Sequence, residues 1–319
     1  MNAGAGWVVQ VDEPAEDSIA TVPGLPRFDR ACRAADRHAP FEEHTLLTLQ
    51  GHRQVPHARF TVVERQRLLG CAVLNQGLDA WYAELATHPD HRRRGVAGAL
   101  LAAVRGHVRS HGGGPLRHWV HELLPAVRAL SPHARTQRSL LVMRRALDDT
   151  LPDNTAGTRW LDPDADRDAW LRLTNAAFVG HPENGGWTRA DLDWRLDAAW
   201  TDPSCWPVVA DGDALVAGVW TKVEPGSPDG ELYVVAVAPH AQGRGLGKRV
   251  VAAALQGLSR RGCSTALLYV DAENAPAVAL YTWAGFTTSK AHRCLEETVL
   301  GPQPARTERG QPAASVPPR

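Results

Sequence analysis

The chain has 319 residues, and its 35 lysines and arginines balance 35 aspartates and glutamates, so the formal net charge is zero. A neutral chain has no overall attraction to nucleic acid or to an anionic membrane, and we expect neither as a partner. No apolar run reaches the roughly 20 residues that span a bilayer, and the N-terminus lacks the basic stretch and apolar core of a secretory signal.

The length suits two domains of ordinary size. In the first half we predict strands at 7–11, 57–64, 68–75, 80–87, 116–121 and 138–145. The predicted helices are 25–37, 42–49, one that follows strand 80–87 and ends near 110, and a short one after strand 116–121. Gly112-Gly113-Gly114-Pro115 ends the third of these helices, because glycine and proline interrupt helical patterns.

The same order of elements recurs after a polar linker. Predicted strands are 158–161, 206–210, 214–223, 231–237 and 264–270, and predicted helices are 165–178, 188–200, 248–261 and 275–284. Repeated order indicates duplication of one mixed α/β unit. We expect domains at 1–148 and 158–300, a linker at 149–157, and a disordered tail at 301–319, where five prolines accompany few apolar residues.

A glycine-rich loop, Gln242-Gly243-Arg244-Gly245-Leu246-Gly247, joins strand 231–237 to helix 248–261. Helix N-termini leave N–H groups unpaired and carry partial positive charge, so such a loop can hold a pyrophosphate. Glycine lets the backbone approach the ligand. A weaker copy, Arg92-Arg93-Arg94-Gly95-Val96-Ala97, lies 150 residues earlier. The two loops predict a phosphate ligand in each half, with only the second half fully equipped.

The residues of the second loop allow three interpretations. A dinucleotide-binding turn would need G-x-G-x-x-G spacing, which is absent. A plain strand-to-helix turn with chance glycines explains any glycine-rich loop. The pattern Gln/Arg-x-x-Gly-x-Gly/Ala resembles the coenzyme A pyrophosphate loop of the GNAT N-acetyltransferases.

The GNAT resemblance continues from Tyr269 to Tyr281 and through Ala284-Gly285-Phe286. Asn274 can cap a helix that begins at Ala275, and Tyr281 lies about two turns further on. The resemblance implies an α/β fold of two tandem GNAT domains. Each would have a central mixed, mostly antiparallel sheet flanked by helices.

Residues 174–187, Trp220-Thr221-Lys222-Val223 and Gly230-Glu231-Leu232-Tyr233-Val234 resemble the tandem GNAT enzymes of mycothiol biosynthesis. That resemblance is close only from about 174 to 288. It implies acetyl transfer from acetyl-CoA, the cosubstrate, to the cysteine amine of desacetyl-mycothiol, a cysteinyl-glucosaminyl-inositol. The alternatives are a GNAT enzyme for another small amine or a protein N-terminus, and a non-enzymatic acyl-CoA sensor.

The resemblance also implies roles for single residues. Glu231 would act as general base through a water, and Tyr281 would protonate the departing thiolate; read without the family, they are a strand-end glutamate and a packing aromatic. Substrate contacts would come from Glu43, Glu183, Lys222, Glu231 and Tyr269. Coenzyme contacts in the second half would come from Val235, Ala236, Val237, Gln242, Gly243, Arg244, Gly245, Leu246, Gly247, Lys248, Asn274, Ala275, Pro276, Ala277, Val278 and Ala279. Those in the first half would come from Leu85, Ala86, Thr87, Arg93, Arg94, Gly95, Val96, Ala97 and Gly98.

The first half lacks the catalytic groups. Alignment of Pro89 with Pro239 places Trp81 where the second half has Glu231, and no tyrosine follows Tyr82 in the first half. We therefore expect a degenerate, non-catalytic domain that binds acetyl-CoA structurally. A metal bound by His118 and His121 is rejected, because alternation along a strand points them to opposite faces.

The five cysteines are scattered, with no metal-type spacing. They predict reduced, mostly buried thiols in a cytoplasmic protein without a metal cofactor. No cysteine or serine stands out as a nucleophile, so we expect direct attack in a ternary complex. We also expect the protein to be a monomer. The cysteines are Cys32, Cys71, Cys205, Cys263 and Cys294.

Overall fold

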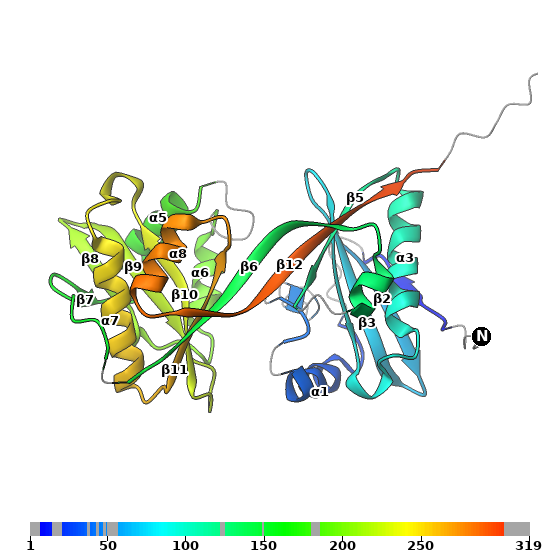
Figure 1. Ribbon diagram of the computed structural model, residues 1–319, viewed down its shortest axis with the longest axis horizontal. Helices are drawn as coiled ribbons and strands as arrows, with labels where there is room; N and C mark the ends of the chain where they lie inside the picture. Colours follow the sequence, from blue (N-terminus) through cyan, green and yellow to red (C-terminus); the bar gives the residue numbers. More distant parts are fainter. Residues whose placement is uncertain are drawn as a thin grey trace, which may run out of the picture. The chain divides into compact units, whose positions relative to one another are not determined.

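The computed structural model describes residues 7–14, 21–36, 39–42, 45–46, 49, 57–121, 125–148, 150–179 and 186–302. They form two compact units. The first unit comprises residues up to Gln137 together with those from Cys294 onward, and the second comprises Arg138–Arg293. The predicted division into consecutive domains at 148 and 158 does not match these units. Strands β6 (Arg135–Ala146) and β12 (Thr287–Leu300) each have residues in both (Figure 1).

The first unit has a mixed sheet whose neighbours follow the order β1-β2-β3-β4-β5-β12. β4 and β5 are parallel, whereas β1–β2, β2–β3 and β3–β4 are antiparallel. The strands are β1 (Gln10–Asp12), β2 (His57–Glu64), β3 (Arg67–Gln76), β4 (Trp81–Thr87) and β5 (Gly113–Val120), joined by the end of β12. The helices are α1 (Leu25–Asp36), α3 (Val96–Ser110) and α4 (Pro125–Leu130), with a 3₁₀ turn, η1 (Pro89–His91).

Strand β5 begins three residues earlier than predicted, at Gly113 instead of residue 116. Its glycines end helix α3, as expected, but they also allow close pairing with the end of β12. A Cβ on Gly113 would lie 2.5 Å from the carbonyl oxygen of Val299 and from the nitrogen of Gly301. Only glycine fits there, because that backbone approach leaves no room for a side chain.

The second unit repeats the plan, with the sheet order β6-β11-β10-β9-β8-β7. β10 and β11 form a parallel pair, whereas β6–β11, β10–β9, β9–β8 and β8–β7 are antiparallel, so the predicted mixed, mostly antiparallel architecture is confirmed. The strands are β7 (Arg159–Trp160), β8 (Pro207–Asp211), β9 (Ala214–Lys222), β10 (Asp229–Val237) and β11 (Thr265–Asp271), with parts of β6 and β12. The helices are α5 (Arg167–Ala177), α6 (Arg189–Leu196), α7 (Leu246–Arg260) and α8 (Ala275–Trp283), with 3₁₀ turns η2 (Pro203–Cys205) and η3 (Pro239–Ala241).

Helix α6 is shorter than the predicted 188–200. Thr188 and Asp191 form a capping box that starts it. The chain turns away after Leu196, where the Thr201 hydroxyl donates to the Arg195 carbonyl at 2.6 Å. A helix that covers a sheet need only be as long as the apolar stripe it buries, and only Leu192 of α6 is fully buried.

Helices cover both faces of the second sheet. A Cβ on Gly218 of β9 would lie 2.6 Å from Trp170 of α5, and a Cβ on Gly230 of β10 would lie 2.6 Å from Leu258 of α7. Figure 1 shows α7 and α8 on the near side of the strands, with α5 and α6 behind. We call these the α7 face and the α5 face. Among the described residues, no helix is long and apolar enough to cross a bilayer.

Candidate functional site

The parallel strands of the second unit separate soon after they pair. The register joins β10 to β11 at only three positions, from Asp229 with Thr265 to Glu231 with Leu267. From Val234 to Val237, β10 pairs on its other side, with β9. The backbone groups on the β11 side of this stretch can therefore bind an extended ligand as an added strand would.

A β-bulge at Tyr233 sets which side chains face the opening. Glu231 pairs with Lys222 and Val234 with Trp220, so Tyr233 is the extra residue on β10. Because cross-strand partners share a face, Glu231 and Val234 both lie on the α5 face, although they are three residues apart. Without the bulge, strict alternation would place them on opposite faces.

Cationic and aromatic side chains surround Glu231 on the α5 face. Lys222 Nζ lies 3.1 Å from Glu224 Oε1, 4.9 Å from the ring centre of Trp200 and 5.7 Å from that of Tyr233. The Tyr233 hydroxyl accepts a hydrogen bond from Arg195 Nε at 3.2 Å. This side of the open strand therefore presents a half-buried carboxylate beside fixed positive charge and aromatic rings.

Tyr281 belongs to helix α8, which covers the α7 face. Asn274 Oδ1 accepts from the Ala277 amide at 3.2 Å, so Asn274 caps α8 as the sequence predicts. A Cβ on Gly247 of α7 would lie 3.2 Å from Leu280, which places the Tyr281 turn of α8 against the start of α7. Tyr281 is buried, and burial raises the pKa of its phenol well above the ordinary value. The phenol is protonated at neutral pH and can donate a proton.

The other predicted substrate residues have different outcomes. Tyr269 is on the Glu231 side of the sheet, because it lies two residues after Leu267, the partner of Glu231. It is 41% exposed, and its ring centre is 5.7 Å from that of His292. Glu43 and Glu183 lie outside the described residues.

The glycine-rich loop has the geometry of an anion site. Gly243 and Gly245 have φ of 74° and 75°, and Gly245 is the N-cap of α7. No side chain caps the helix, so its first amides keep their hydrogen-bonding capacity for an anion. A Cβ on either glycine would meet nothing within 4 Å, which leaves this side of the loop open.

The first unit repeats this backbone closely. Arg93 and Gly95 have φ of 60° and 85°, and α3 also begins without a side-chain cap. The side chains around it differ. Arg92 forms two hydrogen bonds to Asp36, at 2.8 and 2.6 Å, and the Trp7 indole donates to the Arg94 carbonyl at 2.7 Å. At least one of the three arginines thus has a protein partner.

The predicted match of Trp81 to Glu231 is wrong by one residue. β4 pairs with β3 without a register shift, so it has no counterpart of the Tyr233 bulge. Tyr82, paired with Asn75 and Arg117, occupies the place that Glu231 has in the second unit. Its hydroxyl donates to Asp79 Oδ1 at 3.0 Å and accepts from Arg117 Nη1 at 2.8 Å. The expected lack of a carboxylate at this place still holds.

The sequence interpretation overlooked two polar groups in the first unit. Glu84 lies on β4, where its carboxylate accepts from the Glu42 amide at 2.7 Å and from the Thr45 hydroxyl at 2.5 Å. Ser131, 150 residues before Tyr281, accepts a hydrogen bond from Arg105 at 3.1 Å. The repeat spacing could have indicated Ser131, whereas the role of Glu84 depends on tertiary contacts.

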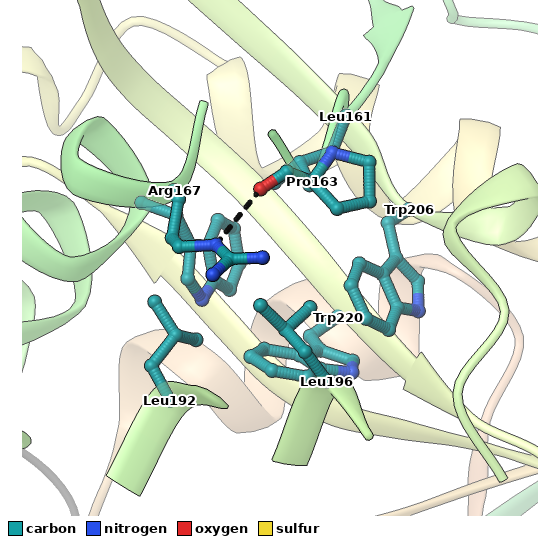
Figure 2. A pocket seen from close by; sticks show the side chains of 8 residues that line it. Leu161, Pro163, Arg167, Leu192, Leu196, Trp206 and Trp220 are labelled. Atoms are coloured by element: carbon teal, nitrogen blue, oxygen red, sulfur yellow. Dashed lines mark hydrogen bonds between the residues drawn. The ribbon is translucent and has the colours of Figure 1, made fainter. Parts of the chain in front are cut away.

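A small hollow under α5 and α6 is not a substrate site. Figure 2 shows Leu192, Leu196 and the indoles of Trp206 and Trp220 around it, with Arg167 Nε donating to the Pro163 carbonyl at 3.2 Å. The cavity volume is about 10 Å³, which holds at most one water molecule. The surrounding tryptophans are core, and they fix the position of strand β9.

The cysteines show no activated thiol. None of the five forms a disulfide, and all are buried. Burial raises the pKa of Cys71 to about 12 and that of Cys32 to about 11, so both thiols are protonated at neutral pH. Among them no thiolate nucleophile is available for a covalent acyl intermediate.

Comparison with known proteins agrees with this arrangement. The family model described as "Acetyltransferase (GNAT) family" matches residues 167–286, and "Acetyltransferase (GNAT) domain" matches residues 56–131. A mycothiol acetyltransferase of Salinispora arenicola is 41% identical over 276 residues, which cover 82% of this chain and 89% of the relative. One of Salinispora tropica is 40% identical over 299 residues, which cover 89% and 95%. The chain belongs to the mycothiol acetyltransferases of the GNAT family.

A solved tandem GNAT structure shows the same fold as this mycothiol acetyltransferase family member. The tandem GNAT protein from the clavulanic acid biosynthesis pathway superposes with a TM-score of 0.64 at 19% identity. The match covers 93% of this chain and 100% of that structure. Tandem repetition of the GNAT fold, predicted from the two loops, is confirmed.

Proposed function

We propose that the second unit transfers the acetyl group of acetyl-CoA to the cysteine amine of desacetyl-mycothiol, the last step of mycothiol formation. One observation carries the assignment. The bulge at Tyr233 places the Glu231 carboxylate beside the strand edge that β11 leaves open. An uncapped, glycine-rich helix N-terminus follows directly on the same strand. This combination supports a base that acts next to a bound acyl thioester.

The reaction follows from these groups. An α-amine has an ordinary pKa near 8, so Glu231 need only remove a proton, through a water, from the fraction still charged. A backbone N–H of Val235 to Val237 polarises the thioester carbonyl. The C–N bond forms and the attacking nitrogen gives up its second proton to solvent, the C–S bond breaks, and Tyr281 protonates the leaving thiolate and regains a proton from solvent. No step needs a metal.

Binding is divided between the loop and the α5 face. The amides of Gly243 to Gly247 hold the pyrophosphate, and Arg244 and Lys248 add charge. The α8 start, from Asn274 to Ala279, closes the coenzyme site. Lys222, Tyr269 and Glu231 bind the hydroxyl-rich acceptor, together with Glu43 and Glu183 as the resemblance implies.

The first unit serves a different purpose in this proposal. Its loop, from Arg93 to Gly98, and strand residues Leu85 to Thr87 hold a second acetyl-CoA that does not react. The support is the shared backbone of the two loops, with Tyr82 in the place of the Glu231 carboxylate and Ser131 in the place of the Tyr281 phenol. We further propose a cytoplasmic monomer with small-molecule partners only, in keeping with five cysteines that form no disulfide.

Release of CoA tests the function directly. Purified protein with acetyl-CoA and cysteinyl-glucosaminyl-inositol should release one thiol of CoA for each acceptor acetylated. Glucosaminyl-inositol is the matched control, because it keeps a free sugar amine but lacks the cysteine. Release that does not exceed the background with either compound would reject the assignment, and equal release with both would reject the cysteine amine as acceptor.

A further inference from the structure

Two histidines and a glutamate meet at the surface of the first unit. His107 and His111 lie one turn apart on α3, with their rings stacked at 4.1 Å between centres and 23° between planes. Glu13, which follows strand β1, reaches His107 Nδ1 at 3.2 Å through Oε1. One donor atom from each of the three side chains lies within 4.8 Å of the others. We propose that Glu13, His107 and His111 bind a divalent transition-metal ion.

The histidine contacts leave a lone pair for the metal. His111 Nδ1 lies 2.9 Å from the His107 carbonyl oxygen, which can only accept, so Nδ1 carries the proton. Nε2 of His111 is then the unprotonated nitrogen. A ring nitrogen bonded to a backbone carbonyl is the usual way in which proteins orient a histidine ligand. His111 is thus prepared as a ligand.

Aromatic neighbours hold both rings in place. The ring centre of Trp81 lies 6.0 Å from that of His107 and 6.1 Å from that of His111. Phe60 packs edge-on against His107 at 5.7 Å. Because these contacts restrict the rotamers, the two imidazoles lose little freedom when an ion binds.

The donor set selects the class of ion. Two imidazoles and a carboxylate suit Zn²⁺, Ni²⁺ or Cu²⁺, whereas Mg²⁺ and Ca²⁺ require mainly oxygen ligands. Tetrahedral zinc with bonds of about 2.0 Å needs donors about 3.4 Å apart, so small side-chain movements complete the site. Glu13 and His111 are exposed, which leaves the remaining position to water.

The ion would fasten the N-terminal segment to helix α3. β1 pairs with β2 at only three positions, Gln10 to Asp12, and Trp7 just before it bonds to the loop at Arg94. A metal between Glu13 and α3 would secure this short edge strand. The site is structural and takes no part in the proposed acetyl transfer.

Calorimetric titration of the metal alone into EDTA-treated full-length protein tests the site. Zn²⁺ should bind with one ion per chain, and Mg²⁺ should give no heat. His111→Gln and Glu13→Gln should each weaken zinc binding at least about tenfold, since each removes a ligand. His133→Gln, an exposed histidine of the same unit, is the matched control and should bind like the wild type.

Thermal unfolding gives a second readout. Zn²⁺ should raise the midpoint for the wild type and His133→Gln, and leave that of His111→Gln unchanged, because a ligand stabilises only the fold that binds it. Zinc binding of equal strength in the wild type and His111→Gln, or no binding at all, would overturn the proposal. The outcome is independent of acetyl transfer, since CoA release is measured separately.

Discussion

The β4–α3 connection of the first unit and the β10–α7 connection of the second have the same backbone but different chemistry. Both pass through a 3₁₀ turn, two residues with positive φ and an uncapped helix start. The strands before them differ by one residue. β10 contains the Tyr233 bulge and β4 contains none. The backbone geometry of the loop is therefore local, whereas the face on which Glu231, the proposed base, lies depends on strand register.

The bulge also changes which residues are comparable. When residues are counted back from the two loops, Glu231 corresponds to Trp81, whose ring packs near His107 on α3. When the strand registers are compared, Glu231 corresponds to Tyr82, whose hydroxyl forms hydrogen bonds with Asp79 and Arg117. One inserted residue thus moves a side chain from one face of the sheet to the other. Equivalent residues of the two units are therefore identified from the strand register and not from the distance to the loop.

The largest expected effect is the loss of the proposed base. Glu231→Gln keeps the size of the side chain and should lower kcat by about 10²-fold to 10⁴-fold, the usual contribution of general acid–base catalysis. Steady-state CoA release measures it. Tyr82→Glu in the first unit is the mirror change and should neither add activity nor rescue Glu231→Gln. Undiminished kcat in Glu231→Gln would exclude Glu231 as the base.

Substitution of the helix-capping glycines compares the two loops directly. Gly245→Val should raise KM for acetyl-CoA by about tenfold or more, because a β-branched residue at positive φ costs roughly 1–2 kcal/mol and blocks the open side of the loop. Gly95→Val imposes the same strain in the first unit and should leave kcat/KM within about twofold. Equal effects of the two changes would contradict the assignment of chemistry to the second unit.

Removal of the phenol should have a smaller effect. Tyr281→Phe should lower kcat by about tenfold, because a thiolate with an ordinary pKa near 8.5 leaves without much help from an acid. Ser131→Ala, at the corresponding place in the first unit, is the control and should leave turnover unchanged. CoA release by the wild type and by Tyr281→Phe, measured at one neutral pH, gives the difference in kcat. Equal kcat in the two enzymes would exclude Tyr281 as the acid.

The smallest expected effect is on stability in acid. Burial lowers the pKa of His88 and His118 in the first unit. The unfolded chain takes up protons near pH 6.5, before the folded chain does, so the free energy of unfolding is greatest above that pH. It should fall as the pH drops below about 6.5. Urea unfolding in EDTA at pH 7.5 and 5.5 measures this, and His118→Gln should reduce the difference.

Much of the fold was predictable because its signals are local. The Asn274 cap, the α7 and α8 helices and the glycine-rich loop depend on residues a few positions apart, and each lies where the pattern placed it within two residues. The lack of a carboxylate at the Glu231 place in the first unit also followed from the sequence. The proposed catalytic roles of Glu231 and Tyr281 stay predictions until the variants are measured.

What the sequence could not reveal depends on contacts between distant residues. The Tyr233 bulge, the bonds of Glu84 to Glu42 and Thr45, and the approach of Glu13 to His107 all join separate elements. Periodicity and capping follow from backbone geometry, so the sequence by itself determined two repeated units, each with a loop of positive-φ residues before an uncapped helix. Strand register depends on which side chains pack best across the whole sheet, so only the tertiary structure decided on which face Glu231 lies. The same holds for the sharing of strands, because only the tertiary structure shows that β6 and β12 have residues in both units.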